Sequence, residues 1–533
     1  MEWVSDVIGE DYKKWNKGDV VTVKAQTGTG KTYFIIGDKH KKGFIDKIGS
    51  NEKVLYLCNR LCLERQIKLE LLKKFDMNIK YRGKEPDFEW LDKIENIKNV
   101  TVTTYHKIAS EKLYNKYGFG TFSLSEFQYI ISDECHFFLT DSSFMNKSYL
   151  VYDELIKKTN KNAIRIFISA TIEEFNNIMK EDLNIKGQMY EYNQNEDYSY
   201  LNVKYFKKLK DIFQIIKNDK SSDKWLIFVT NKDKGKELKD KLNKYGIKVE
   251  FIYANTENDE KRNIISTNSF KSKVLITTKC LDNGINIKDK EVKNLVVIAF
   301  DKVTFIQEIG RKRIDINNPQ QVNLYIPMLG INNFNMLLKN QNKKFETIEL
   351  FKNDREGFKI KYNHNPSYPK DIFYLNENNI YILNQLGERR LIEDYKFTKS
   401  IKESIGYDKF AYVKEQLKWL GLSKTFNEDN LIENVVDIKE IQTLKNYLEK
   451  INQNDIRLDK EDFIKDIDKI IKSKLGNSLD ELLIKLDNNK RRRKGLKQYN
   501  KLFSLLELPY IVGSKKIKIK GKKATKWIVI KKE

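Results

Sequence analysis

Between an apolar run at Val20–Val23 and a helical pattern, the chain reads Ala25-Gln26-Thr27-Gly28-Thr29-Gly30-Lys31-Thr32. This stretch nearly fits the eight-position phosphate-binding loop that joins a strand to a helix, with Ala25 at the position of the first glycine. Gly28 and Gly30 allow the backbone to turn its N–H groups around phosphate oxygens, and the start of the helix adds its positive dipole end. Lys31 is expected to reach the β- and γ-phosphates, and the Thr32 hydroxyl to bind Mg²⁺. The stretch from Thr27 to Thr32 therefore predicts a nucleotide site.

Two adjacent carboxylates follow another apolar run, Tyr129–Ser132. They are Asp133 and Glu134, about a hundred residues after the loop and in the same predicted sheet. Asp133 is expected to hold the hydration shell of Mg²⁺, and Glu134 to orient and deprotonate an attacking water. A solvated strand end is the alternative interpretation, and the shared sheet favours the functional one.

Two parts of the chain alternate short apolar runs with helix-length segments. Continuously apolar runs suit strands that are buried on both faces, as in a parallel sheet covered by helices. We therefore predict two doubly wound α/β domains, over residues 1–196 and 197–330, joined near Tyr192–Leu201. The runs are Val20–Val23, Val54–Leu57, Val100–Thr103, Tyr129–Ser132 and Ile164–Ser169 in the first domain, and Trp225–Val229, Val249–Tyr253, Val274–Thr277, Leu295–Ala299 and Val322–Ile326 in the second.

Helical patterns dominate after about residue 330, which predicts a helical accessory region over residues 331–475 and a candidate surface for protein partners. Its expected helices are Asn332–Lys352, Tyr412–Gly421, Ile438–Asn452 and Lys460–Lys474.

The end of the chain is strongly basic. From Lys490 to Glu533 there are sixteen Lys or Arg and two Glu, so more than half of the chain's net charge of +24 lies there. A helical stretch to Leu506 precedes expected strands, and this order predicts a basic winged-helix-like module over residues 476–533. The expected strands are Pro509–Val512, Ile517–Ile519 and Trp527–Ile530, with a turn at Gly521–Thr525.

Lysines interleave with isoleucines in this module, which places charge on one strand face and apolar groups on the other. Lys515, Lys516 and Lys518 are expected to follow the phosphates of DNA or RNA. A solvated basic tail is the alternative interpretation.

Composition narrows the class of protein. The 533 residues are 40% hydrophobic and carry 99 Lys or Arg against 75 Asp or Glu, which indicates a globular chain with a polyanionic partner. The four cysteines form no Cys-x-x-Cys pair, which argues against a zinc ribbon, an iron–sulfur cluster and a disulfide framework. With neither a signal peptide nor a membrane-length apolar run, a cytoplasmic location is expected.

The second site, Asp133-Glu134-Cys135-His136, resembles the DExH box of superfamily-two helicases, and Ala25–Thr32 resembles motif I of that superfamily. Six further stretches resemble its remaining motifs in the expected order. They are Asn59–Gln66 (motif Ia), Thr103–His106 (the next strand-end motif), Ser169–Thr171 (motif III), Trp225–Asn231 (motif IV), Thr278–Asn286 (motif V) and Gln307–Arg313 (motif VI). The resemblance covers about residues 15 to 328. It implies two tandem RecA-like domains that bind ATP between them and nucleic acid across both.

The resemblance also implies roles for single residues. Ser169 and Thr171 would couple the state of ATP to domain closure, and Asp282 and Gly284 would help to bind the nucleotide. Three residues of motif VI would approach the γ-phosphate from the second domain: Gln307, Arg311 and Arg313. The residues expected along the nucleic acid are Asn59, Arg60, Gln66, Thr103, Thr104, His136 and Thr278.

Two motifs depart from the common pattern. The second arginine of motif VI ordinarily follows the first by three residues, where this chain has Ile314, whereas Arg313 follows Arg311 by two. Both arginines therefore stay candidates for the arginine finger. In motif V, Asn283 and Asn286 stand where Glu and Asp are common.

These patterns predict a helicase or translocase that depends on ATP and Mg²⁺. We favour DNA over RNA because winged-helix modules are commoner in DNA-binding proteins, an argument from fold analogy. The alternatives are an RNA helicase, a scaffold with a vestigial ATPase, and the motor subunit of a restriction, defence or replication assembly that translocates without unwinding.

Overall fold

The structure is a computed structural model of the 533 residues. It describes residues 2–83, 85–116, 123–140, 148–157, 163–182, 187–253, 256, 258–278, 286–315, 318–363, 367–376, 378–433, 438–471, 495–519 and 522–532. The chain forms two compact units. Unit one comprises residues 1–203, 223–239 and 248–427, and unit two comprises residues 204–222, 240–247 and 428–533.

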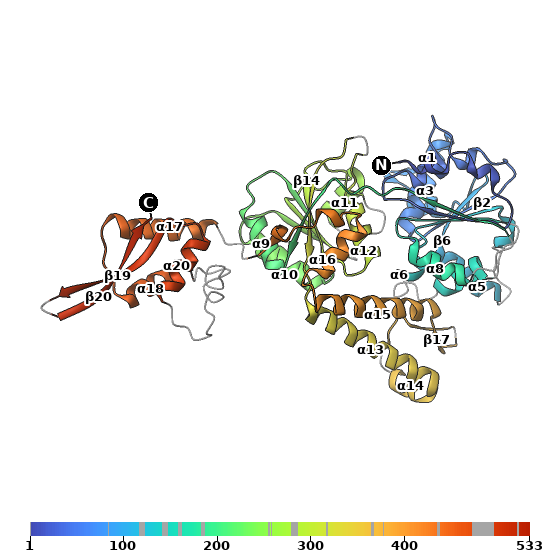
Figure 1. The fold of residues 1–533 in the computed structure, drawn as a ribbon. Helices are drawn as coiled ribbons and strands as arrows, with labels where there is room; N and C mark the ends of the chain where they lie inside the picture. The colour runs from blue at the N-terminus through green and yellow to red at the C-terminus, as the bar shows by residue number, and fades with distance from the viewer. Residues whose placement is uncertain are drawn as a thin grey trace. The chain divides into compact units, whose positions relative to one another are not determined.

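The first α/β domain is built on a seven-stranded sheet (Figure 1). The strand order is β5 (Asn96–Ile97), β6 (Val100–Thr104), β2 (Val54–Cys58), β7 (Tyr129–Asp133), β8 (Ile164–Ser169), β1 (Val20–Lys24) and β9 (Met189–Asn193). Neighbouring strands are parallel except β5, which runs antiparallel to β6. Nearly every side chain of β1, β2 and β8 is buried, because helices cover both faces of the sheet.

The helices of this domain complete the predicted doubly wound architecture. They are α1 (Val4–Ile8), α2 (Lys31–Ile36), α3 (Leu61–Lys74), α4 (Phe88–Asp92), α5 (Tyr105–Lys116), α6 (Phe137–Thr140), α7 (Ser148–Tyr152) and α8 (Glu173–Asp182). A two-residue hairpin, β3 (Tyr81–Arg82) with β4 (Glu85–Pro86), lies outside the sheet.

The second α/β domain repeats the architecture. Five parallel strands follow one another in the order β12 (Val249–Ile252), β13 (Val274–Thr277), β11 (Lys224–Phe228), β14 (Val292–Val297) and β15 (Val322–Pro327). The accompanying helices are α10 (Lys232–Asn243), α11 (Asp259–Thr267) and α12 (Lys302–Arg311). Both predicted parallel-sheet domains are therefore confirmed.

The accessory region within unit one is a helical arm, here defined as residues 331–419 (Figure 1). It contains α13 (Ile331–Asn353), α14 (Arg355–Tyr362), β16 (Phe373–Leu375), β17 (Tyr381–Leu383), α15 (Gln385–Ile405) and α16 (Ala411–Trp419). Leu386 of α15 belongs to the core of the first domain, together with Phe137 of α6. Arg389 donates to both carboxylate oxygens of Asp182, at 2.8 and 2.9 Å. The arm is thus anchored in the first domain.

Unit two contains α9 (Leu209–Asn218) and a parallel pairing of β18 (Leu431–Ile432) with the end of β10 (Leu201–Phe206). Its C-terminal part consists of α17 (Ile438–Gln453), α18 (Lys460–Ile471), α20 (Leu496–Leu505), β19 (Tyr510–Ile519) and β20 (Lys522–Lys531). One core joins these elements, with Leu444, Phe463, Tyr499 and Trp527 among its buried residues. The predicted boundary at residue 475 does not coincide with this core, because the core includes α17 and α18.

The structure corrects the predicted C-terminal hairpin in two respects. Pro509–Val512 and Ile517–Ile519 were expected as separate strands, but both segments lie in or next to β19, a single strand that pairs with β20 from Tyr510 to Ile519. Gly513 and Ser514 face Ile528 and Trp527 across the hairpin, so the ladder continues through them. The turn expected at Gly521–Thr525 is shorter, because Lys523 and Thr525 are already paired. The cationic run Lys490–Lys494 lies outside the described residues.

None of the helices in the described part of the chain combines the length and the apolar character that a membrane span requires.

Candidate active site

The loop after β1 has the backbone conformation that its glycines permit. Gly28 and Gly30 have φ angles of +97° and +83°, in the left-handed region that other residues rarely adopt. The helix α2 begins at Lys31, so its first N–H groups face the loop. Gly310 of α12 packs directly on this loop, since a Cβ atom there would lie 2.6 Å from Thr27 Oγ1.

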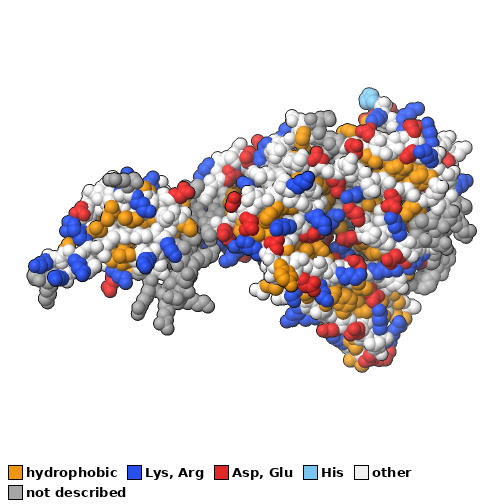
Figure 2. Space-filling view, viewed as in Figure 1, with side chains coloured by type: hydrophobic (Ala, Val, Ile, Leu, Met, Phe, Trp, Pro, Cys, Tyr) orange, Lys and Arg blue, Asp and Glu red, His pale blue; other side chains and the backbone are white. Residues whose placement is uncertain are grey.

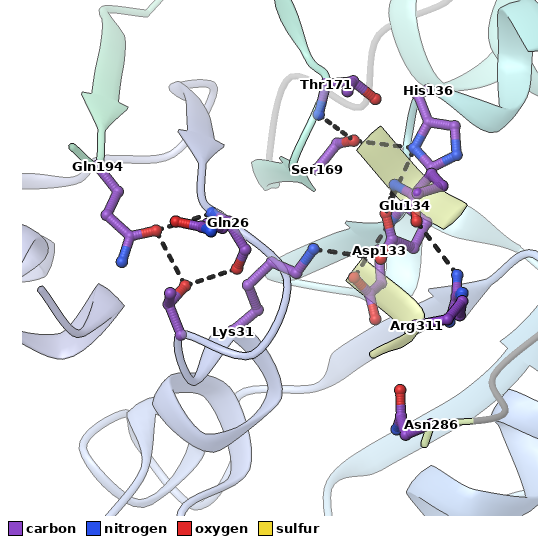
Figure 3. A network of polar contacts seen from close by, with 12 residues as sticks. Gln26, Lys31, Asp133, Glu134, His136, Ser169, Thr171, Gln194, Asn286 and Arg311 are labelled. Atoms are coloured by element: carbon purple, nitrogen blue, oxygen red, sulfur yellow. Dashed lines mark hydrogen bonds and ion pairs between the residues drawn. The ribbon is translucent and has the colours of Figure 1, made fainter. Parts of the chain in front are cut away.

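The two carboxylates lie where β7 ends. The Tyr56 hydroxyl donates to Asp133 Oδ2 at 2.9 Å, and the Glu134 N–H donates to Asp133 Oδ1 at 3.0 Å. Glu134 has a φ angle of +52°, which is uncommon for a residue with a side chain and typical of strain at a functional site. Its Oε1 lies 3.2 Å from Lys31 Nζ, so the loop and the carboxylates form one site (Figure 3).

The electrostatics of the pair are asymmetric. Burial and the neighbouring Glu134 carboxylate raise the pKa of Asp133 to about 6. Burial alone would also raise the pKa of Glu134, but the ammonium of Lys31 and the side chain of His136 hold it below its ordinary value. Glu134 is therefore ionised at neutral pH and able to accept a proton.

Motif III lies beside the carboxylates at the end of β8. His136 Nδ1 is 2.8 Å from Ser169 Oγ and 3.3 Å from Glu134 Oε2. Ser169 Oγ also accepts a hydrogen bond from the Thr171 N–H at 3.1 Å (Figure 3). The predicted coupling residues are thus linked to Glu134 through His136.

Motif VI, on α12 and just after it, supplies the opposite wall. Gln307 Nε2 lies 3.5 Å from Glu134 Oε2, and Arg311 Nη2 donates to Gln307 Oε1 at 3.1 Å. Arg313 Nε donates to Asn286 Oδ1 at 2.8 Å. Arg313 Nη1 lies so close to the loop that a Cβ atom on Gly28 would be 3.3 Å from it. The two arginines therefore differ, because Arg311 faces the glutamine and Arg313 faces the loop.

These groups surround a cleft of about 140 Å³ that opens to solvent. The cleft is fit for a polyphosphate. Among the described residues, the buried atoms Thr27 Oγ1 and Arg313 Nη1 have no hydrogen-bond partner. Burial and the neighbouring Arg311 lower the pKa of Arg313 to about 10, which leaves it charged at neutral pH. A buried cation without a full set of acceptors matches an anionic ligand.

Mg²⁺ requires oxygen ligands, and Thr32 and Asp133 both line the cleft. No group of three or more His, Cys, Asp or Glu side chains within the described ranges is arranged to hold a metal ion. The residues therefore fit a magnesium ion bound mainly through phosphate and water, with Thr32 and Asp133 contributing.

The residues predicted along the nucleic acid occupy several places. Asn59, Arg60 and Gln66 line the same cleft as Lys31, at the start of α3. Thr103 and Thr104 end β6, where Thr104 Oγ1 accepts from the Lys107 N–H at 3.2 Å. Thr278 directly follows β13. Asp282 and Gly284 lie outside the described residues.

Three participants were not predicted from the sequence. Tyr56, Tyr105 and Gln194 contact Asp133 or the loop, yet each is distant from its partner along the chain. Tyr56 looks like any apolar strand residue, and its phenol in a buried strand was the one available signal.

Family models match both α/β domains. The family described as "Type III restriction enzyme, res subunit" matches residues 2–174, and the "Helicase conserved C-terminal domain" matches residues 205–314. The chain belongs to the superfamily-two helicases. As a helicase it is a nucleic-acid-dependent ATPase, with ATP as its nucleotide and nucleic acid as its partner. A comparison with curated proteins gave no match.

Solved structures resemble the helicase at low identity. S. cerevisiae Dbp5 bound to RNA and ADP BeF3 is 16% identical over 61% of this chain and 82% of its own, with a TM-score of 0.41. The Mycobacterium smegmatis helicase Lhr bound to ssDNA and AMP-PNP is 14% identical over 61% of this chain and 45% of its own, with a TM-score of 0.41. A DEAD box protein from the hyperthermophile Methanococcus jannaschii is 19% identical over 60% and 85%, with a TM-score of 0.34. Similarity at this level carries no conclusion about the substrate.

Proposed function

We propose that the helicase couples the hydrolysis of Mg-ATP to movement along DNA. The observation that carries the proposal is the convergence of both α/β domains on one cleft. Lys31 and Glu134 come from the first domain, and Gln307, Arg311 and Arg313 come from the second. A site assembled from two domains is complete only when they are close together, which links hydrolysis to domain movement.

Each side chain has a chemical task in this proposal. Lys31 exchanges its contact with Glu134 for the phosphates, which frees the Glu134 carboxylate to orient and deprotonate the attacking water. Bound Mg²⁺ neutralises phosphate charge, and Thr32 and Asp133 are the residues that would hold it. Gln307 lies next to Glu134 and helps to orient it. Arg313, beside Gly28, is our assignment for the arginine finger, while Arg311 holds Gln307 in place.

Two observations favour DNA over RNA as the substrate. The first matching family is described as a restriction-enzyme subunit. The C-terminal part of unit two has helices followed by a hairpin, and Leu458 bridges to Trp527 as a third, one-residue strand. This order of elements supports our proposal of a winged-helix-like module, a kind of module that is commoner in DNA-binding proteins, which is an argument from fold analogy.

ATP hydrolysis measured with single-stranded DNA, duplex DNA and RNA at equal nucleotide concentration tests the substrate. We expect the larger stimulation from DNA. Stimulation by RNA alone would contradict the DNA assignment and leave the ATPase assignment intact.

A second candidate function is translocation on duplex DNA without unwinding, which the description of the first family also favours. A strand-displacement assay and a triplex-displacement assay on the same DNA separate the two functions. Displacement of the triplex strand without separation of the duplex would identify a translocase.

The hairpin of β19 and β20 is the proposed second contact with nucleic acid. Lys515, Lys516 and Lys518 are exposed on it, and Figure 2 shows Lys and Arg side chains along this hairpin. Lys526 is different, because it forms an ion pair with Asp459 at 2.6 Å. Val512 and other core residues lie in the half of the hairpin that is farther from its turn. The exposed lysines are not part of this core, so they can be changed without disturbing it.

Changing Lys515, Lys516 and Lys518 together to Gln should leave the melting temperature unchanged and weaken DNA binding. The slope of log K against log salt should become shallower by about 0.7 to 0.9 for each phosphate that the variant no longer neutralises. Fluorescence anisotropy at several salt concentrations measures this slope. The matched control changes three exposed lysines of the arm, Lys339, Lys343 and Lys399, to Gln. A hairpin variant that binds like this control would exclude the hairpin from the interface.

A further inference from the structure

The side of the loop that faces away from the carboxylates has its own polar network. Gln26 is the second residue of the loop, Gln194 directly follows β9, and each is only 4% exposed. In Figure 3 these two side chains lie on one side of Lys31, with Asp133 and Glu134 on the other. Neither glutamine takes part in the chemistry proposed above.

The Gln194 side chain contacts both the backbone of the loop, at Gln26, and one side chain of the loop, that of Thr29. Its Oε1 accepts from the Gln26 N–H at 2.7 Å and lies 2.9 Å from the Thr29 hydroxyl. Its Nε2 donates to the Glu2 carbonyl, and its own N–H donates to the Lys24 carbonyl at 3.0 Å. All of these side-chain bonds are buried or partly buried, where removing one partner leaves an unsatisfied group.

Gln26 makes a second connection, to the linker that leads to the second domain. Its Nε2 donates to the Asp197 carbonyl at 3.1 Å, and its Oε1 accepts from the Asp197 N–H at 2.9 Å. A primary amide can donate and accept at once without carrying charge. A carboxylate could make one of these two bonds only.

The linker between Asp197 and β10 is held in place by burial and by a hydrogen bond. Asp197 is four residues before β10, and the two tyrosines between them, Tyr198 and Tyr200, are both buried. The Asp197 carboxylate also accepts from the Ser199 N–H at 2.9 Å. A shift of the second domain would therefore reach the Asp197 backbone and, through its two hydrogen bonds, Gln26.

We propose that Gln26 and Gln194 are positioning residues that make the affinity of the loop for ATP depend on the course of the linker. This inference rests on the proposed function, because nucleic acid held by both domains is what fixes the linker. The two glutamines thereby carry part of the coupling between nucleic-acid binding and ATP binding. Coupling of this kind is reciprocal. ATP therefore increases the affinity for nucleic acid by the same factor by which nucleic acid increases the affinity for ATP.

The experiment measures that factor directly. Dissociation constants of a fluorescent, non-hydrolysable ATP analogue are determined with and without saturating oligothymidylate. The coupling factor is the constant without oligothymidylate divided by the constant with it. Gln26→Met keeps the length of the side chain and removes both bonds to Asp197. The coupling factor of this variant should be about tenfold smaller than that of wild type, or equal to one if the wild-type factor is below ten. A tenfold change is the scale of two neutral hydrogen bonds. The converse measurement determines the affinity for oligothymidylate with and without the analogue. The coupling factor from this measurement should decrease by the same amount.

Several outcomes decide the inference. If Gln26 only supports the fold of the loop, its substitution would weaken binding of the analogue equally with and without oligothymidylate. An unchanged coupling factor in the variant therefore overturns the inference. A wild-type coupling factor of one overturns it as well. Gln26→Glu, which keeps the bond from the Asp197 N–H, should give an intermediate ratio. Gln188→Met is the matched control, because Gln188 is exposed directly before β9 and its side chain accepts only from Tyr190 among the described side chains.

Gln194→Met repeats the test if Gln26→Met does not fold, since it releases the loop from the other side. Lys31→Ala separates this inference from the proposed function. If Lys31→Ala binds the analogue like wild type, the nucleotide site itself is wrong. If Lys31→Ala binds poorly and the glutamine variants keep the wild-type ratio, only the inference is overturned.

Discussion

Glu134→Gln should bind ATP with near wild-type affinity and lose about a thousandfold in turnover. The amide keeps the size of the side chain but cannot take a proton from water, and general-base catalysis contributes roughly 10²–10⁴ in rate. The Lys31 contact at 3.2 Å supports retained binding, because removing the carboxylate also removes a competitor for the Lys31 ammonium. Steady-state ATPase rates and equilibrium nucleotide binding measure the two effects separately.

Lys31→Ala is the contrasting variant for this prediction. It should weaken both ATP binding and turnover, since the ammonium acts on the phosphates themselves. Near wild-type hydrolysis by Glu134→Gln would refute the assignment of the catalytic base.

Arg313→Ala should reduce turnover by on the order of a thousandfold with little change in DNA affinity. An arginine finger is worth roughly 10³–10⁵ in rate, because it meets the charge that develops in the transition state. Arg313 Nη1 is buried beside Gly28 without a hydrogen-bond partner among the described residues, as a group held ready for an anion would be. Single-turnover hydrolysis and DNA binding are the measurements.

Arg311→Ala should have the smaller effect, about tenfold to a hundredfold, because this side chain acts through Gln307. Arg262→Ala is the control, since Arg262 lies on the exposed surface of α11, paired with Asp259. A larger reduction in Arg311→Ala than in Arg313→Ala would reverse the assignment of the finger.

Much of the fold could be predicted because its signals are local. The central strands are continuous apolar runs, and each functional residue stands just after one of them, as Lys31 does after β1 and Asp133 at the end of β7. The strand β9 was not predicted, since Met-Tyr-Glu-Tyr-Asn carries no continuous apolar run. It forms because β1 offers it an edge, and Lys24 pairs with Asn193.

The helix α15 was also not predicted, although it is 21 residues long. Its buried positions include Leu386, Leu391, Thr398 and Ile401, and many charged residues stand between them in the sequence. The reason is tertiary, since Leu386 belongs to the core of the first domain while Thr398 accepts from Gln341 of α13 at 3.0 Å.

The candidate site was predicted in its chemistry and missed in its connections. Lys31, Asp133 and Glu134 are fixed by residue type and order along the chain. The bonds of Gln194 to the loop join positions 168 and 165 residues apart, so nothing in the sequence brings them together. The choice between Arg311 and Arg313 likewise depends on the direction of each side chain, at the last residue of α12 and just after it.

The helical arm has a consequence for the autonomy of the first domain. Leu386 fills space in a core whose other members lie between Val20 and Met179, and Arg389 makes both of its bonds to Asp182. A fragment that ends at residue 196 would lack this leucine, and an unfilled leucine site in a packed core costs about 2–5 kcal/mol. That is a large fraction of the stability of an ordinary domain. The first domain is therefore expected to need the arm for its full stability, because Leu386 of the arm is part of the hydrophobic core of that domain.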